Sequence, residues 1–326
     1  MLRNYELLSA QVNLMGVIKA RKTIDRYLKR TNLTHYSELS RLVGCEIFVK
    51  HENHQPTGSF KIRGALSFFQ HVAGEDLETG VLVATRGNHG LAMSWAGRCF
   101  NVPCTVVVPE NNNPEINRIV ESFGADLIVQ GRDFYDAEYY CNDLVDSAGY
   151  YYVEQGNEPE ILNGLGTMGL EIFEDLPEVD VIICPIGGGA GCASLARVAQ
   201  AINPDVEIIG VQPERAAAFY ASWREGERVT IEEADTVADG LAARSVFELP
   251  YMILKDRITD VVLVSEEAIL EGIRTALRVT HNLAEGAGAA GISAALQIKE
   301  RLAGKKVVLI MSGGNLGHQH LLQALT

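Results

Sequence analysis

The sequence has no apolar run that approaches the roughly 18 residues a transmembrane helix requires. Residues 1–30 mix charges throughout, and they lack both an apolar signal core and a small-residue cleavage site. These two absences predict a cytoplasmic protein with no membrane partner.

Positive charge is also scarce. The 326 residues include 28 Lys and Arg against 42 Asp and Glu, which gives a formal net charge of −14. Nucleic acids and anionic membrane surfaces attract proteins through clustered positive charge, so neither is an expected partner. A small anionic substrate stays compatible with this charge, because a single cleft can be locally positive.

Paired cysteines and internal repeats are missing too. None of the six cysteines forms a C-x-x-C pair, which argues against a zinc knuckle or a thioredoxin-like site. The sequence has no low-complexity linker and no repeat of about 20–50 residues. At about 100–200 residues per domain, its length predicts two domains, or one large domain with an insertion.

What the sequence does contain is an alternation of short β-rich runs with longer helical periods. Apolar strands that alternate with helices indicate an α/β protein whose mostly parallel sheets are covered on both faces. The polar, acidic stretch Ala217–Val237 is expected to be a surface excursion without a strand. Strands are expected at Cys45–Lys50, Val81–Ala84, Cys104–Val108, Asp126–Val129, Tyr151–Val153, Val179–Cys184, Val206–Val211, Asp260–Val264 and Lys306–Met311, and helices at Asn88–Phe100, Pro114–Phe123, Phe134–Ser147 and Glu266–His281, among others.

The first candidate site is the segment Pro56–Gly64, which reads Pro-Thr-Gly-Ser-Phe-Lys-Ile-Arg-Gly and joins a strand to a helix. Lys61 stands at the start of that helix, where the positive end of the helix dipole lowers the pKa of an amine. A lysine with a lowered pKa suits Schiff-base chemistry. On this segment alone, a surface lysine that follows a turn is the expected interpretation of Lys61.

The second candidate is Thr85–Gly90, which also joins a strand to a helix. Backbone N–H groups at a helix N-terminus bind anions, so a carboxylate would fit here. The alternative is an ordinary turn in which Asn88 caps the helix.

The third candidate is the glycine-rich segment Gly187–Gly191, between an apolar strand and a helix. Consecutive glycines let backbone amides close around a phosphate, with the helix N-terminus behind them. Cys192 replaces the last glycine of a dinucleotide fingerprint, and no Walker Gly-Lys-Ser/Thr follows. A tight strand–helix turn is the alternative.

Two further motifs complete the pattern. Ser312–Asn315 follows an apolar strand, and a hydroxyl at such a strand end points into the crevice where α/β proteins bind ligands. Glu285–Ala289 opens a helix.

Together and in this order, the five motifs resemble the threonine dehydratase and serine racemase family of pyridoxal-phosphate enzymes, known as fold type II, from about Arg21 to Gln319. The resemblance implies a fold like that of the tryptophan synthase β-subunit, with two open, mostly parallel sheets and covering helices. It implies a large cofactor-binding domain of residues 1–75 and 155–326, and a small inserted α/β domain of residues 76–154 that carries the substrate-carboxylate loop. A homodimer is the family's expectation.

The resemblance also implies pyridoxal 5'-phosphate as the cofactor and assigns roles to residues around it. Lys61 would hold the cofactor as a Schiff base and later remove the Cα proton of the substrate. Phe60 would pack against the pyridine ring, Asn88 would bond its 3-hydroxyl and Ser312 would meet its nitrogen. The phosphate would lie against Gly187, Gly188, Gly189 and Ala190, and the substrate carboxylate against Thr85, Arg86, Gly87, Asn88 and His89.

The implied activity is that of a dehydratase, an ammonia-lyase of the EC 4.3.1 type, in amino-acid catabolism. It would convert an L-threo-3-hydroxy amino acid by β-elimination to a 2-oxo acid and ammonia. Threonine or serine and 3-phenylserine-like substrates are equally expected, and 3-hydroxyaspartate is a further alternative. A β-replacement enzyme is the alternative reaction, although Gly-Ser-Phe-Lys-Ile-Arg-Gly favours the dehydratase branch.

The sequence departs from the family in its carboxylate loop. That loop usually reads Ser-Ser-Gly-Asn-His, and serine racemases use its second serine as an acid and base. Arg86 stands in that place, and a guanidinium that is always protonated cannot be this base. Racemisation is therefore not the expected main activity. The charge of Arg86 can pair with the substrate carboxylate, the cofactor phosphate or a nearby acidic side chain, and an outward-pointing arginine is the alternative.

Other departures concern the metal site and the pocket. Metal-dependent members carry a Glu and an Asp where this sequence has Gln212 and Ala218, so no divalent metal site is expected, although a monovalent cation is an alternative. Gly156 and Leu165 replace polar residues near the pocket, which predicts a roomier and more apolar pocket than threonine needs. The Cβ of Ala190 restricts the backbone of the phosphate loop, which predicts looser or shifted phosphate binding.

Overall fold

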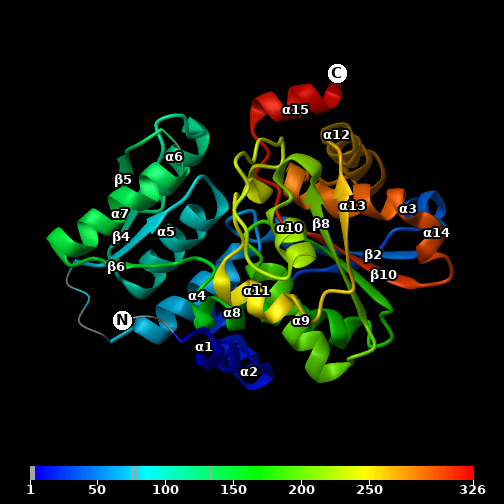
Figure 1. Cartoon of the computed structure of the whole chain (residues 1–326), viewed down its shortest axis with the longest axis horizontal. Coiled ribbons are helices and arrows are strands. Elements are labelled where there is room, and N and C mark those ends of the chain that lie inside the picture. Colours follow the sequence, from blue (N-terminus) through cyan, green and yellow to red (C-terminus); the bar gives the residue numbers. More distant parts are fainter. Residues whose placement is uncertain (1–3, 75–76, 78, 133) are drawn as a thin grey trace.

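The computed structural model describes residues 4–74, 77, 79–132 and 134–326, and within them the strands form two sheets (Figure 1). The larger sheet runs in the order β1-β2-β10-β7-β8-β9, and its strands are parallel except for β1, which is antiparallel to β2. The smaller sheet runs in the order β5-β4-β3-β6 and is wholly parallel. The larger sheet consists of β1 (Leu33–His35), β2 (Glu46–His51), β10 (Lys306–Met311), β7 (Val181–Pro185), β8 (Glu207–Pro213) and β9 (Asp260–Val264), and the smaller one of β5 (Asp126–Val129), β4 (Cys104–Val108), β3 (Val81–Ala84) and β6 (Tyr151–Tyr152).

The central strands are buried because their apolar side chains alternate between two covered faces. Along β7, Val181 and Ile183 join one apolar core while Ile182 joins the other, as the two-residue period of a strand requires. A parallel sheet covered on both faces therefore forms from strands that are apolar throughout.

Helices cover both sheets and fill the space between them. Helix α8 packs against α4, α9 and α2, while α13 packs against β10, β7 and α12. The described helices are α1 (Tyr5–Gln11), α2 (Leu14–Ile24), α3 (Ser37–Val43), α4 (Lys61–Val72), α5 (Asn88–Phe100), α6 (Pro114–Ser122), α7 (Phe134–Ala148), α8 (Pro159–Asp175), α9 (Ala190–Ile202), α10 (Ala218–Glu225), α11 (Glu248–Leu254), α12 (Glu266–Thr275), α13 (Gly286–Gln297), α14 (Lys299–Leu302) and α15 (His318–Leu325).

One apolar core runs from the smaller sheet into the larger one. Val81 and Val83 of β3 belong to the same buried cluster as Ile182 of β7, and helix α4 connects them by packing against both α5 and α8. The segment that carries Lys61 is therefore held between the two sheets. The exact division into residues 1–75 with 155–326 and 76–154 stays a prediction.

The α/β fold with two mostly parallel sheets is confirmed, and the differences from the expected elements are local. Strand β1 was not expected, because Leu33–His35 is too short to show a period and pairs only at the sheet edge. The expected helix Glu266–His281 changes at Thr275 into a π-helical turn, Ala276–Thr280. The stretch Ala217–Val237 has no strand, as expected, but its helix α10 buries Phe219.

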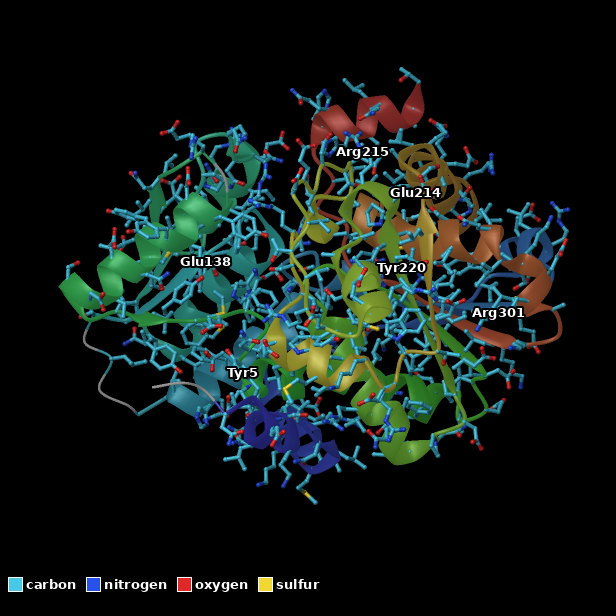
Figure 2. The ribbon with its side chains drawn as sticks, in the orientation of Figure 1. Tyr5, Glu138, Glu214, Arg215, Tyr220 and Arg301 are labelled. Carbon is cyan, nitrogen blue, oxygen red and sulfur yellow. The ribbon has the colours of Figure 1, made fainter. Side chains whose placement is uncertain are left out.

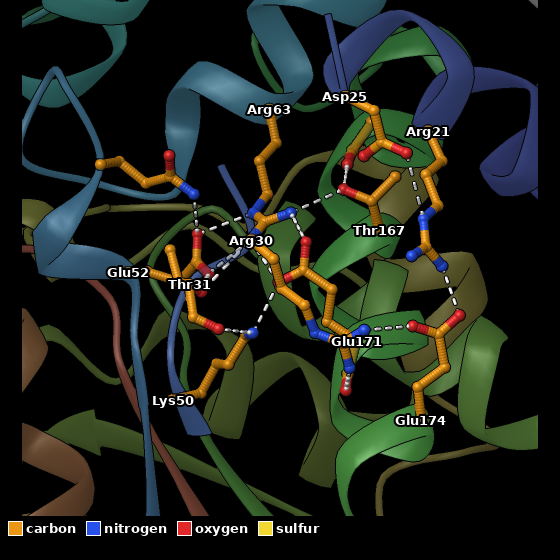
Figure 3. Close-up of polar contacts among 12 residues, drawn as sticks. Arg21, Asp25, Arg30, Thr31, Lys50, Glu52, Arg63, Thr167, Glu171 and Glu174 are labelled. Carbon is orange, nitrogen blue, oxygen red and sulfur yellow. Dashed lines mark hydrogen bonds and ion pairs between the residues drawn. The ribbon is translucent and has the colours of Figure 1, made fainter. Parts of the chain in front are cut away.

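A buried ionic cluster fixes the start of α4 (Figure 3). The guanidinium of Arg63 donates two hydrogen bonds to Glu52, at 2.8 Å each, and two to Glu171, at 2.7 and 2.8 Å. Lys50 of β2 donates to Glu171 at 2.6 Å. Because all four side chains are buried, each charge depends on its partners for stabilisation. The cluster joins β2, α4 and α8 two residues away from Lys61.

None of the helices in the described part of the chain has both the length and the apolarity needed to cross a lipid bilayer.

Candidate active site

A cavity of about 380 Å³ lies at the carboxyl ends of strands from both sheets. This volume falls in the usual range of small-molecule sites, about 300–1,000 Å³. The cavity brings together every residue that the sequence analysis assigned to cofactor or substrate, while their roles stay predictions. These lining residues are Phe60, Lys61, Thr85, Arg86, Gly87, Asn88, His89, Gly187, Gly188, Gly189, Ala190 and Ser312.

Lys61 is the first residue of α4, and its Nζ lies 5.4 Å from the centre of the Phe60 ring. Burial lowers the pKa of Lys61 to about 8, although the nearby Glu285 carboxylate acts in the opposite direction. The position of Lys61 at a helix start predicts a pKa lowered by the helix dipole, whereas in the structure loss of hydration is the main cause of the lowered pKa. A lysine of this kind is a nucleophile and a base near neutral pH.

The turn before Lys61 is attached to the end of β10. The Phe60 N–H donates to the carbonyl oxygen of Ser312 at 3.1 Å, and Ser59 pairs with Gly313 in an antiparallel bridge. Ser312 is itself buried and lines the cavity. The lysine and the serine hydroxyl are therefore positioned by one short stretch of paired backbone.

Asn88 is a cavity residue and not the cap of α5. Gly87 occupies the N-cap position, and the Asn88 side chain bonds to residues outside α5. Its Nδ2 donates to Glu285 Oε1 at 2.7 Å, and its Oδ1 accepts from Asn315 Nδ2 at 2.6 Å. The alternative of an ordinary capped turn is therefore wrong.

Glu285 lines the cavity as well, although its sequence motif indicates only the start of a helix. Burial raises the pKa of Glu285 to about 7, while the hydrogen bond from Asn88 opposes this shift and Asp239 adds to it. Glu285 and Asn315 reach Asn88 from positions far along the chain. The motif Ser312–Asn315 places Asn315 at the site, but only the fold shows that both Asn315 and Glu285 bond to Asn88.

The loop from Thr85 to His89 has a defined shape. The Gly87 N–H donates to Thr85 Oγ1 at 3.1 Å. His89 is buried, and burial, followed by the charge of Lys61, lowers its pKa well below the usual value, so the imidazole is neutral. In the described structure its Nε2 is buried without a hydrogen-bond partner. An unsatisfied buried nitrogen at a cavity wall is available to a ligand.

Arg86 lies on the same loop with an exposed side chain that lines the cavity. Within the described ranges, no hydrogen bond or ion pair involves its guanidinium. Its charge is therefore free to meet an anion at the mouth of the cavity.

The glycine-rich loop enters the cavity at the N-terminus of α9. Gly189 is the N-cap of this helix with φ of 96°, a left-handed conformation that side chains rarely adopt. Ala190 is the first helical residue. A loop that lines the cavity at a helix N-terminus has the geometry that binds phosphate through backbone N–H groups.

Both polar atoms of the Gln212 side-chain amide form hydrogen bonds within the protein. Its Nε2 donates to the carbonyl oxygens of Ile186 and Ala216, at 3.1 and 3.2 Å, and its Oε1 accepts from the Tyr220 N–H at 2.8 Å. Figure 2 places Tyr220 on α10 and Glu214 beyond the end of β8. A buried neutral side chain thus connects β8 to the residue before the glycine loop.

The expectation of a roomier pocket is wrong at both positions that suggested it. Leu165 is fully buried in the core beside Gly64 and does not line the cavity. The space beside Gly156 is filled by the ring of Phe247, because a Cβ on Gly156 would lie 2.1 Å from Phe247 Cδ2.

Residues 24–313 match the family described as pyridoxal-phosphate dependent enzyme. The chain is 36% identical over 305 residues to the L-threonine ammonia-lyase of Thermotoga maritima, with 94% of this chain and 76% of that protein covered. It is 32% identical to the catabolic L-threonine dehydratase of Escherichia coli, with 92% of both chains covered. Among solved structures it is similar to maize serine racemase, with a TM-score of 0.91, 30% identity and 96% of both chains covered.

Proposed function

The chain belongs to the pyridoxal-phosphate-dependent enzymes and is a carbon–oxygen lyase of the ammonia-lyase type, and from this premise we propose that it converts a 3-hydroxy amino acid to a 2-oxo acid and ammonia. Pyridoxal phosphate is its cofactor. The observation that carries the proposal is the half-buried Lys61 with its lowered pKa, which lines one cavity with a glycine loop at a helix N-terminus and with the Thr85–His89 loop.

The residues present fit this cofactor. The amine of Lys61 would bind its aldehyde, and the loop Gly187–Ala190 would hold its phosphate through backbone N–H groups. Ser312 would meet the ring nitrogen, and Asn88 would bond the ring hydroxyl. Bound there, the cofactor supplies an electron sink for the electron pair that remains when a Cα proton is removed.

The chain's own residues would carry out the proton transfer and the binding. Once the substrate amine has displaced it, the Nζ of Lys61 would accept the Cα proton. The N–H groups at the start of α5 would orient the substrate carboxylate, beside the neutral ring of His89. Loss of the Cα proton and of the β-hydroxyl as water forms a carbon–carbon double bond, and the released enamine takes up water to give the 2-oxo acid and ammonia.

We propose threonine or serine as the substrate, because Phe247 closes the space beside Gly156. A 3-phenylserine-like substrate is the second candidate, since Phe134 and Tyr135 also give the cavity aromatic walls. Hydroxyaspartate ranks lower, because several acidic side chains line the cavity and would repel a second carboxylate. A homodimer, a cytoplasmic location and a role in amino-acid catabolism belong to the same proposal.

The proposed reaction is tested by incubating the purified holoenzyme with L-threonine, L-serine, 3-phenylserine and 3-hydroxyaspartate. We expect release of a 2-oxo acid together with an equal amount of ammonia from threonine or serine. The chirality of the remaining substrate should not change, because Arg86 cannot act as a second base. Inactivity on all four compounds, combined with activity in a β-replacement assay, would contradict the proposed reaction.

Arg86 is proposed to attract the substrate carboxylate or the cofactor phosphate. Changing Arg86→Ala should raise KM for the amino acid or weaken cofactor retention by about tenfold, since a charged hydrogen bond contributes about 1.5–3 kcal/mol. Steady-state kinetics and cofactor titration measure the two effects separately. Arg98→Ala, an exposed change at the far end of α5, is the matched control. Wild-type KM and cofactor affinity in Arg86→Ala would support an outward-pointing arginine instead.

We propose that activity needs no divalent cation. The carbonyl oxygens of Ile186 and Ala216, which converge on Gln212, already accept hydrogen bonds from its amide nitrogen. Dialysis of the enzyme against a chelator should leave its rate unchanged. In Gln212→Glu, a carboxylate would face those oxygens without a donor, and the rate should fall at least tenfold unless Mg²⁺ or Ca²⁺ bridges them. Loss of wild-type activity in chelator, with recovery in Mg²⁺, would refute the proposal.

A further inference from the structure

The ring of Phe247 lies between two glycines that belong to different loops. A Cβ on Gly156 would lie 2.1 Å from Phe247 Cδ2, and a Cβ on Gly188 would lie 2.4 Å from Phe247 Cε2. Side-chain carbons do not approach each other this closely, so any larger residue at either position would displace the ring. Two separate loops thus leave room for one aromatic side chain.

Hydrogen bonds fix the backbone that carries this side chain. The Phe247 N–H donates to the carbonyl oxygen of Gly188 at 3.1 Å. Two residues later, the Leu249 N–H donates to Asn157 Oδ1 at 3.1 Å, next to Gly156. The start of α11 is therefore attached to both loops between which the ring is inserted, and Phe247 forms a fixed wall.

The same ring lines the cavity and is only half-buried. The glycine loop that it contacts also lines the cavity, as do Gln155 and Asn157 on either side of Gly156. Phe247 therefore takes up space that would otherwise extend the cavity toward Gly156. We propose that Phe247 determines substrate specificity by limiting the size of the group on C3 of the amino acid.

This inference rests on the proposed function and adds the residue that selects among its substrates. A rigid aromatic wall excludes a large substituent by direct contact, whereas beside the hydroxyl on C3 threonine carries only a methyl group and serine only hydrogen. One methylene more or less on a substrate changes kcat/KM by about 10–200-fold in a hydrophobic pocket. Removing the whole ring of Phe247 should therefore change the relative kcat/KM values by an easily measured factor.

The test is a graded series, Phe247→Leu and Phe247→Ala, with kcat/KM measured for L-threonine, L-serine and 3-phenylserine. We expect the ratio of 3-phenylserine to threonine to rise at least tenfold in Phe247→Ala and by an intermediate factor in Phe247→Leu. The ratio is informative because losses of folded or cofactor-loaded enzyme cancel in it. Phe48→Ala is the matched control, since Phe48 is also half-buried but lies in β2 away from the cavity, and its ratio should not change.

Two outcomes would overturn the inference. An unchanged ratio in both variants would mean that the ring does not limit the substrate. An equal loss on all substrates, with weaker binding of pyridoxal phosphate in a titration, would mean that the ring only supports the glycine loop. If neither the wild type nor any variant releases a 2-oxo acid, the proposed function itself fails, which is a different result from wild-type turnover with an unchanged ratio.

Discussion

Lys61→Ala is expected to lower turnover at least about a thousandfold and to remove the absorbance near the visible edge that the holoenzyme should show. The substitution removes both the covalent attachment of the cofactor and the base that takes the Cα proton. Among the described residues that line the cavity, Lys61 is the only lysine, so no neighbouring amine is placed to replace it. An absorbance spectrum and a 2-oxo acid assay on the same preparation measure both losses.

The matched control is Lys299→Ala, on the exposed face of α14, which should keep both the spectrum and the rate. Treatment with borohydride adds a second readout, because it fixes a Schiff base permanently to the protein. After reduction, Lys61→Ala should carry no covalently attached cofactor. A reduced chromophore attached to another lysine, with turnover retained, would overturn the assignment.

The lowered pKa of Lys61 also predicts how the apoenzyme takes up its cofactor. Only the neutral amine attacks an aldehyde, and the pKa of Lys61 is about 8 where an ordinary lysine has 10.5. Below pH 8 the neutral fraction falls about tenfold for each pH unit, so the rate of reconstitution should rise with pH and level off near 8. A rate that still rises steeply at pH 9 would mean that the amine is hydrated like a surface lysine.

Much of this site could be predicted because its parts follow the ends of parallel strands. Lys61, Gly187 and Ser312 follow β2, β7 and β10, neighbouring parallel strands of the larger sheet, so their convergence at its carboxyl edge follows from the strand–helix alternation. Thr85 follows β3 of the smaller sheet, and the fold brings that second edge to the same cavity. The turns between strand and helix were marked by glycines. Neither inference required knowledge of side-chain packing.

The contacts that were missed join residues that are distant in sequence. Asn88 meets Glu285 across 197 residues, and no local pattern specifies that pairing. Gly156 was interpreted as an opening in the pocket, yet the Phe247 ring from 91 residues away fills it. A glycine in the sequence indicates that a side chain is absent at that position, but not which other side chain takes the space.

Arg63→Ala is expected to reduce the free energy of unfolding by about 3–5 kcal/mol, because it leaves Glu52 and Glu171 buried without their shared cation. Urea unfolding of the holoenzyme measures the change. Arg41→Ala is the control, since the Arg41–Glu38 pair is exposed and such pairs contribute at most about 1 kcal/mol. A loss below 1 kcal/mol in Arg63→Ala would mean that water enters the cluster and hydrates the two carboxylates.

The pH dependence of the same cluster has a definite sign. Burial alone would raise the pKa of Glu52, but the charge and hydrogen bonds of Arg63, with smaller contributions from Lys50 and Thr31, lower it to about 2. A carboxyl whose pKa is lowered in the folded state stabilises that state above its unfolded pKa of about 4.5, and this contribution is lost as the pH falls toward 2. The wild type should therefore lose stability between pH 4.5 and 2.

A double substitution separates the unpaired charge from the lost packing. In Arg63→Ala with Glu52→Gln, the carboxylate that depended most on the guanidinium becomes a neutral amide, while Lys50 still pairs with Glu171 at 2.6 Å. The double variant should be more stable than Arg63→Ala alone and should lose the acid sensitivity assigned to Glu52. If the two substitutions destabilise additively, the cost of Arg63→Ala is a packing defect and the cluster does not act as one electrostatic unit at the start of α4.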